Sequence, residues 1–586
     1  MTGFKYSDGW NQRPLSIVLL VIALCFAEAE SGDINYAIDY HPNMPVDHFG
    51  FSTAEIFPLR YLYNITNYKS GGPILFYPGN DAPITDFAKS VALLWDISKE
   101  MNAAVLFAEH RYYSDKRDNI PFGNALIQNV STMGYLTVAQ TLADYAQLIP
   151  AVKTKLELQQ NTTVVVIGGS YGGVLAALLR LKYPSLFNAA WVSSAPVLYF
   201  RGGGIPLNGF DATVSKALEM SGCTKEVFIQ SFKHLDQLFK DDKDAINRVF
   251  KLEGTNQVNT EADLSDLKAF IREAFETVAQ SNYPYPAKFL GPNGLPAWPL
   301  DAMCVYFANA SENAIAAAQA LYNVTKLFYG NGPYCIKPEN CPPDENNAFF
   351  GTKPLQQCTD LVIQLCASGP KSDANDDDWF WKECEDEASF DAYAKAGYNS
   401  RLLRPDIVRD LYGFDYSETT RIIFSDGNLD PWSAGSITAK VLNGDQDFIS
   451  DSMDRSVYYF WIEGAAHHLD LRQPNTCDQP PVVNARYQII EILKCWTGVS
   501  KAAKCNDPSS LQRELPPRGP KILGNCTSVF NAYPWGQTDE GIDSPPSAPL
   551  PQTTPSSSVS NSYVLSFAII IVNLIGSLFC RIIYER

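Results

Sequence analysis

The chain has 586 residues, 46% of them hydrophobic and 19% charged, so it is long enough to form more than one domain around a large core. Its net charge of −18 argues against nucleic acid or an anionic membrane surface as a partner. The same acidity suits a protein that stays soluble in an acidic or extracellular compartment. No residue spacing fits a zinc site, and we expect neither a metal nor a cofactor.

Residues 1–29 have the pattern of a secretory signal peptide. Lys5 and Arg13 precede an apolar core at 16–26, and Ala27-Glu28-Ala29 forms a small-x-small cleavage site. An uncleaved membrane anchor is the alternative, but the apolar core is short for a transmembrane span. We therefore expect the chain to enter the secretory pathway.

Residues 30–200 predict the first part of an α/β domain. From about residue 70 onward, apolar strands alternate with helical segments such as 136–154, and the strands are expected at 73–77, 104–108, 164–167 and 189–193. Continuous apolar strands that are separated by helices indicate a parallel sheet with both faces covered.

Residues 201–404 interrupt this alternation, because they have helical character and carry most of the cysteines. Strand character returns at 421–424 and 456–462, so residues 405–500 predict the second part of the α/β domain. The simplest organisation is one α/β domain into which a helical cap domain of about 200 residues is inserted.

A candidate nucleophile lies between two pairs of glycines at the end of an expected strand. Gly168-Gly169-Ser170-Tyr171-Gly172 matches G-x-S-x-G, and an apolar helix follows directly. In a strand–turn–helix of this kind the serine hydroxyl stands clear of the sheet, and the N–H of Tyr171 points to where an oxyanion would form. The alternative is a glycine-rich turn that only packs the helix on the strand.

The base and its orienting acid are expected on loops after later strands, in the chain order Ser, Asp or Glu, His. Of the six histidines, only His467 and His468 follow a strand downstream of Ser170. The one strand before them leads to Asp426 and Asp430. The strand order does not decide between Asp426 and Asp430 as the acid, or between His467 and His468 as the base. A structural role for the two histidines, or a metal site, is the alternative. The fold also places a second oxyanion donor near Gly79-Asn80.

These motifs resemble the serine peptidase family that includes lysosomal Pro-Xaa carboxypeptidase and dipeptidyl-peptidase II. The likeness runs from about residue 46 to residue 496, in blocks at 46–49, 76–80, 107–113, 168–173, 430–433 and 467–472. It implies an α/β-hydrolase fold with a large helical cap inserted between the nucleophile half and the Asp/His half. It also implies that Asp430 is the acid and His467 the base, a choice that spacing alone does not make.

The resemblance further implies cleavage next to proline, with some members releasing a C-terminal residue and others an N-terminal dipeptide. Trp432 matches a residue that lines the family's proline slot. Val174 stands where the family usually has methionine, so we expect a wider slot. Glu385 and Asp386 form an acidic pair in the cap that would suit a substrate amine and so favours a dipeptidyl peptidase.

The C-terminal part of the chain predicts a membrane anchor. An extension at 501–543 and a Pro/Ser/Thr-rich stalk at 544–562 precede an apolar run at 563–580, which as a helix would rise roughly 27 Å and span a bilayer. Two arginines in 581–586 are typical of a cytoplasmic tail. We expect a type I single-pass protein at the cell surface or in the lysosome or vacuole. A GPI signal is the alternative, which the charged end disfavours.

Glycosylation and disulfides are expected in a lumenal domain. Six N-x-Ser/Thr sequons are present, at Asn64, Asn129, Asn161, Asn309, Asn323 and Asn525. Of thirteen cysteines, eleven lie outside the two terminal apolar segments, and most are expected to pair. The odd number leaves at least one cysteine free or paired with another chain, and a homodimer is a candidate assembly.

The sequence as a whole predicts a membrane-anchored serine exopeptidase that acts on peptides next to proline or a small apolar residue. Ser170 would form an acyl-enzyme, as a dipeptidyl peptidase or as a Pro-Xaa carboxypeptidase. An esterase or lipase on the same fold and a non-catalytic surface binding protein are the alternatives. A complete triad argues against the binding protein.

Overall fold

The computed structural model describes residues 34–123, 132, 134–288, 294–337, 356, 359–361, 363, 367–368, 379, 381–382, 404–416, 418–438, 456–507 and 510–538. The signal peptide, stalk, membrane span and tail predicted from sequence lie outside these residues, as do Asn129, Glu385 and Asp386. Among the described helices, none combines the length and the apolar character needed to cross a bilayer.

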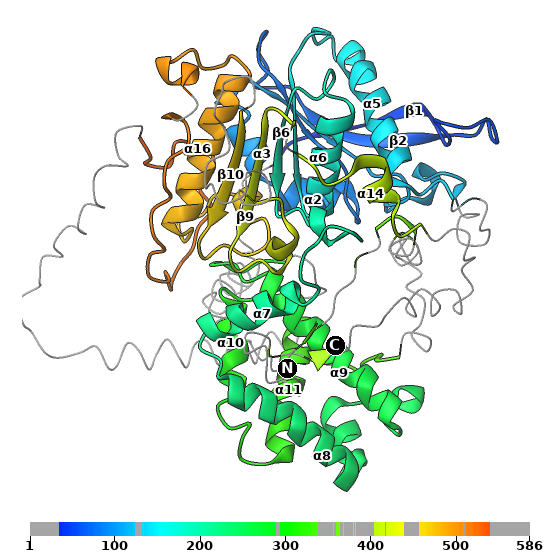
Figure 1. Cartoon of the computed structure of the whole chain (residues 1–586), viewed down its shortest axis with the longest axis vertical. Helices are drawn as coiled ribbons and strands as arrows, with labels where there is room; N and C mark the ends of the chain where they lie inside the picture. The colour runs from blue at the N-terminus through cyan, green and yellow to red at the C-terminus, as the bar shows by residue number, and fades with distance from the viewer. Residues whose placement is uncertain are drawn as a thin grey trace, which may run out of the picture. The chain divides into compact units, whose positions relative to one another are not determined.

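An eight-stranded sheet forms the centre of the larger compact unit, Ile34–Gln537 (Figure 1). Its strand order is β1-β2-β4-β3-β5-β6-β9-β10. The strands are β1 Ala37–Pro45, β2 Ile56–Asn64, β3 Ile74–Tyr77, β4 Ala104–Ala108, β5 Val164–Gly169, β6 Ala189–Ser193, β9 Ile422–Gly427 and β10 Val457–Ile462.

The parallel part of the sheet runs from β4 to β10 and confirms the strands expected from the sequence. β1 and β2 form an additional antiparallel edge that the sequence analysis missed. In β2 the apolar run is broken by Arg60, whose buried guanidinium binds Glu109 at the end of β4. A strand with a buried ion pair in its centre does not show the apolar pattern on which strand prediction depends.

Helices cover both faces of the sheet, as the continuous apolar strands predicted. In β5, Val164 and Val166 belong to one core, and Val165 and Ile167 belong to the other. The first core is closed by α5 Val138–Lys155, α6 Tyr171–Lys182 and α14 Ile407–Tyr412. The second is closed by α2 Ile84–Ser90, α3 Leu93–Ile97 and α16 Pro480–Trp496. This layering is that of an α/β-hydrolase.

The inserted segment contains a helical bundle with its own core. Its helices are α7 Gly209–Met220, α8 Lys225–Phe250, α9 Glu261–Gln280, α10 Pro299–Tyr306 and α11 Ala314–Tyr329 (Figure 1). A disulfide joins Cys223 to Cys304. α9 begins with a capping box in which Thr260 and Asp263 each accept the other's backbone N–H.

The end of the insertion returns to the hydrolase core instead of staying with the bundle. The Asp360 carboxylate accepts the backbone N–H of Val138 at the start of α5, and Leu361 is buried in the core beside α5 and α6. Two short strands, β7 Ala367–Ser368 and β8 Trp381–Lys382, pair antiparallel within the same segment.

The C-terminal extension packs on the second face of the sheet and also binds the cap. Disulfides join Cys477 to Cys526 and Cys495 to Cys505. Lys521 forms an ion pair with Asp301 of α10 at 2.5 Å. The extension therefore links the hydrolase and cap parts through side chains that are far apart in the sequence.

Candidate active site

Ser170 occupies a strained turn between β5 and α6. Its φ of 57° and ψ of −131° lie outside the regions that non-glycine residues normally adopt. The Ser170 N–H donates to the carbonyl of Ser193 on β6 at 3.0 Å, and the Ser170 carbonyl accepts the N–H of Val174 at 3.1 Å. Strand and helix thus hold the turn from both sides, and the partly exposed side chain stands at the end of the sheet.

Close backbone contacts explain the glycines that flank Ser170. A Cβ added to Gly168 would lie 2.0 Å from the carbonyl oxygen of Gly172, and one on Gly173 would lie 2.9 Å from the Cβ of Ala195. Any side chain at Gly168 would push α6 away from β5. Gly168 and Gly173, one from each glycine pair, are therefore required by the tight packing around the nucleophile elbow.

His467 and Asp430 form a buried pair on the loops after β10 and β9. The Nδ1 atom of His467 lies 3.0 Å from each carboxylate oxygen of Asp430. Asp430 Oδ1 also accepts the backbone N–H of Trp432 at 3.1 Å, which fixes the carboxylate. Because a carboxylate can only accept, Nδ1 carries the proton and Nε2 is left as an acceptor, the tautomer that a general base requires.

The other acid and the other histidine have different surroundings. Asp426 is buried and accepts the hydroxyl of Ser436, and burial raises its pKa well above the usual value. The backbone N–H of His468 donates to Ser194 Oγ, and burial lowers the pKa of its imidazole well below the usual value. A Cβ on Gly169 would lie 3.1 Å from the His468 ring, so the histidine loop lies against the serine turn.

The sequence predicts a second oxyanion donor at Gly79, on the loop after β3. The N–H of Gly79 already donates to the hydroxyl of Tyr145 at 2.8 Å, so this group has another partner. The following residue, Asn80, is buried, and its side-chain amide donates to the carbonyl of Gly169 at 2.9 Å. Asn80 is thereby fixed next to the serine turn. Tyr171 is the first residue of α6, where a backbone N–H has no intrahelical acceptor.

A directed chain of hydrogen bonds fixes the Tyr171 side chain. Tyr113 donates to Gln356 Oε1 at 2.7 Å, Gln356 Nε2 donates to Tyr171 at 3.1 Å, and Tyr171 Oη lies 3.0 Å from His110 Nε2. His110 Nδ1 lies 2.6 Å from the carbonyl of Arg111 and must donate to it, so Nε2 accepts from Tyr171. Burial lowers the pKa of His110 to about 4, so the imidazole stays neutral in mildly acidic solution.

The substitution Tyr171→Phe is expected to destabilise the fold by about 1–3 kcal/mol, because it leaves a buried donor on Gln356 and a buried acceptor on His110 without this partner. The free energy of unfolding in urea measures the effect. Tyr183→Phe, at the partly exposed C-terminal end of α6, is the matched control. Equal losses in the two variants would contradict the role of the chain of hydrogen bonds.

The residues expected to line the substrate slot lie in different environments. Trp432 packs against Phe210 of α7 and against Tyr199, at ring-centroid distances of 4.8 and 5.6 Å. Its indole N–H donates to Gln280 Oε1 at 2.8 Å. Val174 is a residue of α6 and is buried in the hydrolase core. The aromatic cluster thus joins Trp432 to the cap, whereas Val174 belongs to the hydrolase core.

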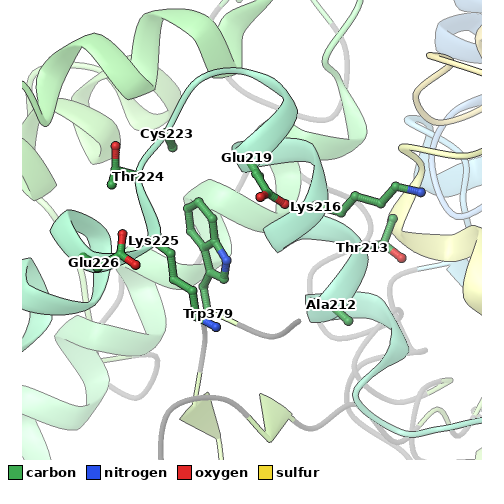
Figure 2. Close-up of a pocket in the computed structure, with 9 residues that line it drawn as sticks. All are labelled: Ala212, Thr213, Lys216, Glu219, Cys223, Thr224, Lys225, Glu226 and Trp379. Carbon is green, nitrogen blue, oxygen red and sulfur yellow. The ribbon is translucent and has the colours of Figure 1, made fainter. Parts of the chain in front are cut away.

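A separate hollow of about 670 Å³ lies within the cap. Side chains of α7 and α8 surround it, including Lys216, Glu219 and Lys225, together with Trp379 (Figure 2). Among the described residues, neither the expected catalytic residues Ser170, Asp430 and His467 nor the expected slot residues Trp432 and Val174 line it. The described sequons are compatible with glycosylation, because Asn161, Asn309 and Asn525 are exposed, and Asn64 and Asn323 are partly exposed.

Sequence reasoning missed the cap residues that reach this site. Gln280 and Tyr283 contact His467, and Gln356 contacts Tyr171. No local motif marks any of the three. His110 lies in a block that matches the family, but its position gave no indication that it would contact the residue after the nucleophile.

The comparisons with known proteins agree with this geometry. The family model described as serine carboxypeptidase S28 matches residues 44–489. The Caenorhabditis elegans protein pcp-1 is 34% identical over 89% of this chain and 96% of its own length. Human lysosomal Pro-X carboxypeptidase is 33% identical over 79% of this chain and 88% of its own length. The chain belongs to the serine carboxypeptidase S28 family and is a serine-type peptidase.

Proposed function

We propose that the protein is a carboxypeptidase that releases the C-terminal residue following a proline. The observation that carries the proposal is the Nδ1 contact of His467 with both oxygens of Asp430, next to a serine elbow, in a member of this family. Relatives at 33% identity are named lysosomal Pro-X carboxypeptidase, in human and in Bos taurus. These names favour a carboxypeptidase over the dipeptidyl peptidase that remained open from the sequence.

In the proposed mechanism, Ser170 Oγ attacks the carbonyl carbon of the proline residue, and His467 Nε2 takes the hydroxyl proton. Asp430 holds the imidazole and stabilises the imidazolium that forms. His467 then gives the proton to the leaving amine, and the peptide bond breaks to leave an acyl-enzyme. Water then attacks the acyl carbon while His467 takes its proton. His467 returns that proton to Ser170 Oγ as the acyl–oxygen bond breaks, which releases the shortened peptide and the free serine.

We assign the oxyanion site to the backbone N–H groups of Tyr171 and Asn80. Tyr171 stands at the N-terminus of α6, where the helix dipole favours negative charge. Asn80 replaces Gly79 in this role, since the Gly79 N–H is engaged by Tyr145. The position of Asn80 is fixed by its side-chain bond to Gly169, directly before the nucleophile.

The slot for proline is proposed at Trp432. Its indole, on the loop that carries Asp430, packs with the rings of Phe210 from α7 and Tyr199 from the turn after β6 into an apolar aromatic cluster. A proline ring is rigid and has no N–H to satisfy, so an aromatic wall suits it. The contribution of Val174 to the width of the slot stays a prediction, as does amine binding by Glu385 and Asp386.

The direct test uses the full-length protein and its Ser170→Ala variant with two peptides. One is blocked at its N-terminus and ends in Pro-Phe, and the other is Lys-Pro-reporter with a free amine. We expect the wild-type protein to release phenylalanine from the first peptide, and the variant to lose at least about 10³-fold in kcat. Cleavage of the second peptide alone would make the protein a dipeptidyl peptidase.

Two further readouts address the remaining alternatives. A long-chain ester hydrolysed faster than either peptide would favour an esterase or lipase. A fluorophosphonate probe should label Ser170 in the wild-type protein and not in Ser170→Ala. Absence of labelling and of cleavage between pH 4 and pH 8 would favour a binding protein.

For the location, we propose entry into the secretory pathway and retention by the apolar run 563–580. The support is the signal-like N-terminus, the disulfides Cys477–Cys526 and Cys495–Cys505, and relatives named lysosomal. The homodimer stays a prediction without a structural observation behind it.

A further inference from the structure

We propose that two cap residues, Gln280 and Tyr283, are positioning residues for the catalytic base and for the proline slot. This inference rests on the proposed function, because it assigns roles around His467 and Trp432. In this proposal the cap covers the active site and also holds the catalytic base and the slot residue in position.

Both polar groups of the His467 main chain are bound by the cap. The His467 N–H donates to the carbonyl of Gln280 at 3.1 Å, and the hydroxyl of Tyr283 donates to the carbonyl of His467 at 3.0 Å. Tyr283 and His467 are 184 residues apart in the sequence. Since His467 sits on a loop after β10, these two bonds fix the main chain from which the imidazole reaches Asp430.

The Tyr283 hydroxyl is well suited to this role. Its side chain is fully buried, and the guanidinium of Arg472 lies 4.4 Å from the ring centroid. Burial raises the pKa of Tyr283 above its usual value, so the hydroxyl stays protonated and can donate. Its own carbonyl accepts the N–H of Trp298 at 2.8 Å, one residue before α10, which fixes the segment to the cap.

The Gln280 side chain contacts the second functional element, Trp432. The indole N–H can only donate, so the Gln280 atom 2.8 Å from it is the amide oxygen. The amide nitrogen donates to the carbonyl of Glu276 at 3.2 Å, which is consistent with this orientation. The backbone N–H of Trp432 in turn binds Asp430. One cap residue therefore contacts the base through its main chain and the slot through its side chain.

The two side chains should affect different kinetic constants. Removing the Tyr283 hydroxyl removes one of the two bonds that fix the His467 main chain. The imidazole is then positioned less well for the chemical step, so kcat should fall. Removing the Gln280 amide oxygen frees the Trp432 indole but leaves the backbone bond to His467 intact, so it should weaken binding of a proline ring and raise KM. A residue with a purely structural role would not divide its effects in this way.

The experiment compares Tyr283→Phe and Gln280→Met in the full-length protein, with N-blocked peptides that end in Pro-Phe and in Ala-Phe. Active sites are counted with a fluorophosphonate probe, so that kcat refers to folded enzyme only. We expect Tyr283→Phe to lower kcat about tenfold on both peptides, with KM changed less than about twofold, in line with the loss of one buried hydrogen bond. We expect Gln280→Met to raise KM about three- to tenfold on the prolyl peptide only.

Matched controls are available within the cap. Tyr329→Phe removes a hydroxyl that binds Glu273 and Phe270 of α9, and Gln319→Met removes an amide that binds Asn323 on α11. Both controls should leave kcat and KM unchanged.

The inference is wrong if Tyr283→Phe and Gln280→Met behave like these controls. It is also wrong if both variants lower kcat to the same extent, or if Gln280→Met raises KM equally on the prolyl and the alanyl peptide. Failure of the proposed function has a different signature, because then the wild-type protein would not cleave the prolyl peptide or Ser170→Ala would keep its activity. If an ester proves to be the substrate, the effect of Tyr283→Phe on kcat is measured with that ester and remains decisive.

Discussion

The substitution Asp430→Asn is expected to lower kcat by about 10³–10⁴-fold while leaving the fold intact. The Asp430 carboxylate accepts the Nδ1 proton of His467 through oxygens that lie 3.0 Å away. An asparagine amide in its place can donate to Nδ1, which moves the imidazole proton to Nε2. In the proposed mechanism Nε2 must accept the Ser170 hydroxyl proton, and a protonated Nε2 cannot do so.

Asp426→Asn is the matched control, because Asp426 is the other acid that the sequence order allowed. Burial raises the pKa of Asp426, and its side chain binds the hydroxyl of Ser436. A neutral amide of the same shape therefore changes little, and we expect kcat to stay within about threefold of wild type. Both variants are measured on the N-blocked peptide ending in Pro-Phe, with active sites counted by the fluorophosphonate probe. Loss of activity in Asp426→Asn alone would reverse the assignment of the acid.

The strand, the serine turn and the helix of the candidate site could be predicted from sequence because their signals are local. A β-branched strand, a glycine-flanked serine and an apolar helix are consecutive in the chain. Each of these segments corresponds to one structural part of the nucleophile elbow. The order of the later strands then limits the acid and the base to two residues each. The choice between them depends on where each side chain points, which spacing does not encode.

The contacts of the cap could not be predicted in this way. Gln280 ends a long amphipathic helix, Tyr283 lies in the turn after it, and both bind His467 across a large separation in sequence. Gln356 reaches Tyr171 from a segment that the sequence assigned to the cap. A hydrogen bond between distant segments leaves no periodicity in either of them. The antiparallel edge was missed for a related reason, since Arg60 interrupts β2 and its partner Glu109 is remote.

The substitution Arg111→Met is expected to destabilise the protein by about 3–5 kcal/mol, because it leaves a buried charge without its partner. Arg111 and Asp144 are fully buried and joined by two bonds, from Nε at 2.6 Å and from Nη2 at 2.5 Å. The remaining Nη1 donates to the carbonyls of Val46 and Tyr135. In the variant, Asp144 would lose both bonds from Arg111 and would keep its contact with His48.

The cluster around Arg111 also supports the active site. Asp144 precedes Tyr145 on α5, and the Tyr145 hydroxyl binds the N–H of Gly79, next to the proposed oxyanion donor Asn80. The cluster brings together the blocks 46–49 and 107–113, which in the sequence were markers of the family without an assigned role. We therefore expect Arg111→Met to lose activity as well as stability, with the two losses growing together as temperature rises.

The free energy of unfolding in urea measures the stability loss. Arg248→Met is the control, because Arg248 is largely exposed and pairs with Asp242 on the surface of the cap. That control should change stability by no more than about 0.5–1 kcal/mol. The double variant Arg111→Met with Asp144→Leu removes the unpaired carboxylate and should recover part of the loss. A double variant no more stable than Arg111→Met alone would show that the cost arises from the lost bonds to Val46 and Tyr135, and not from the buried charge of Asp144.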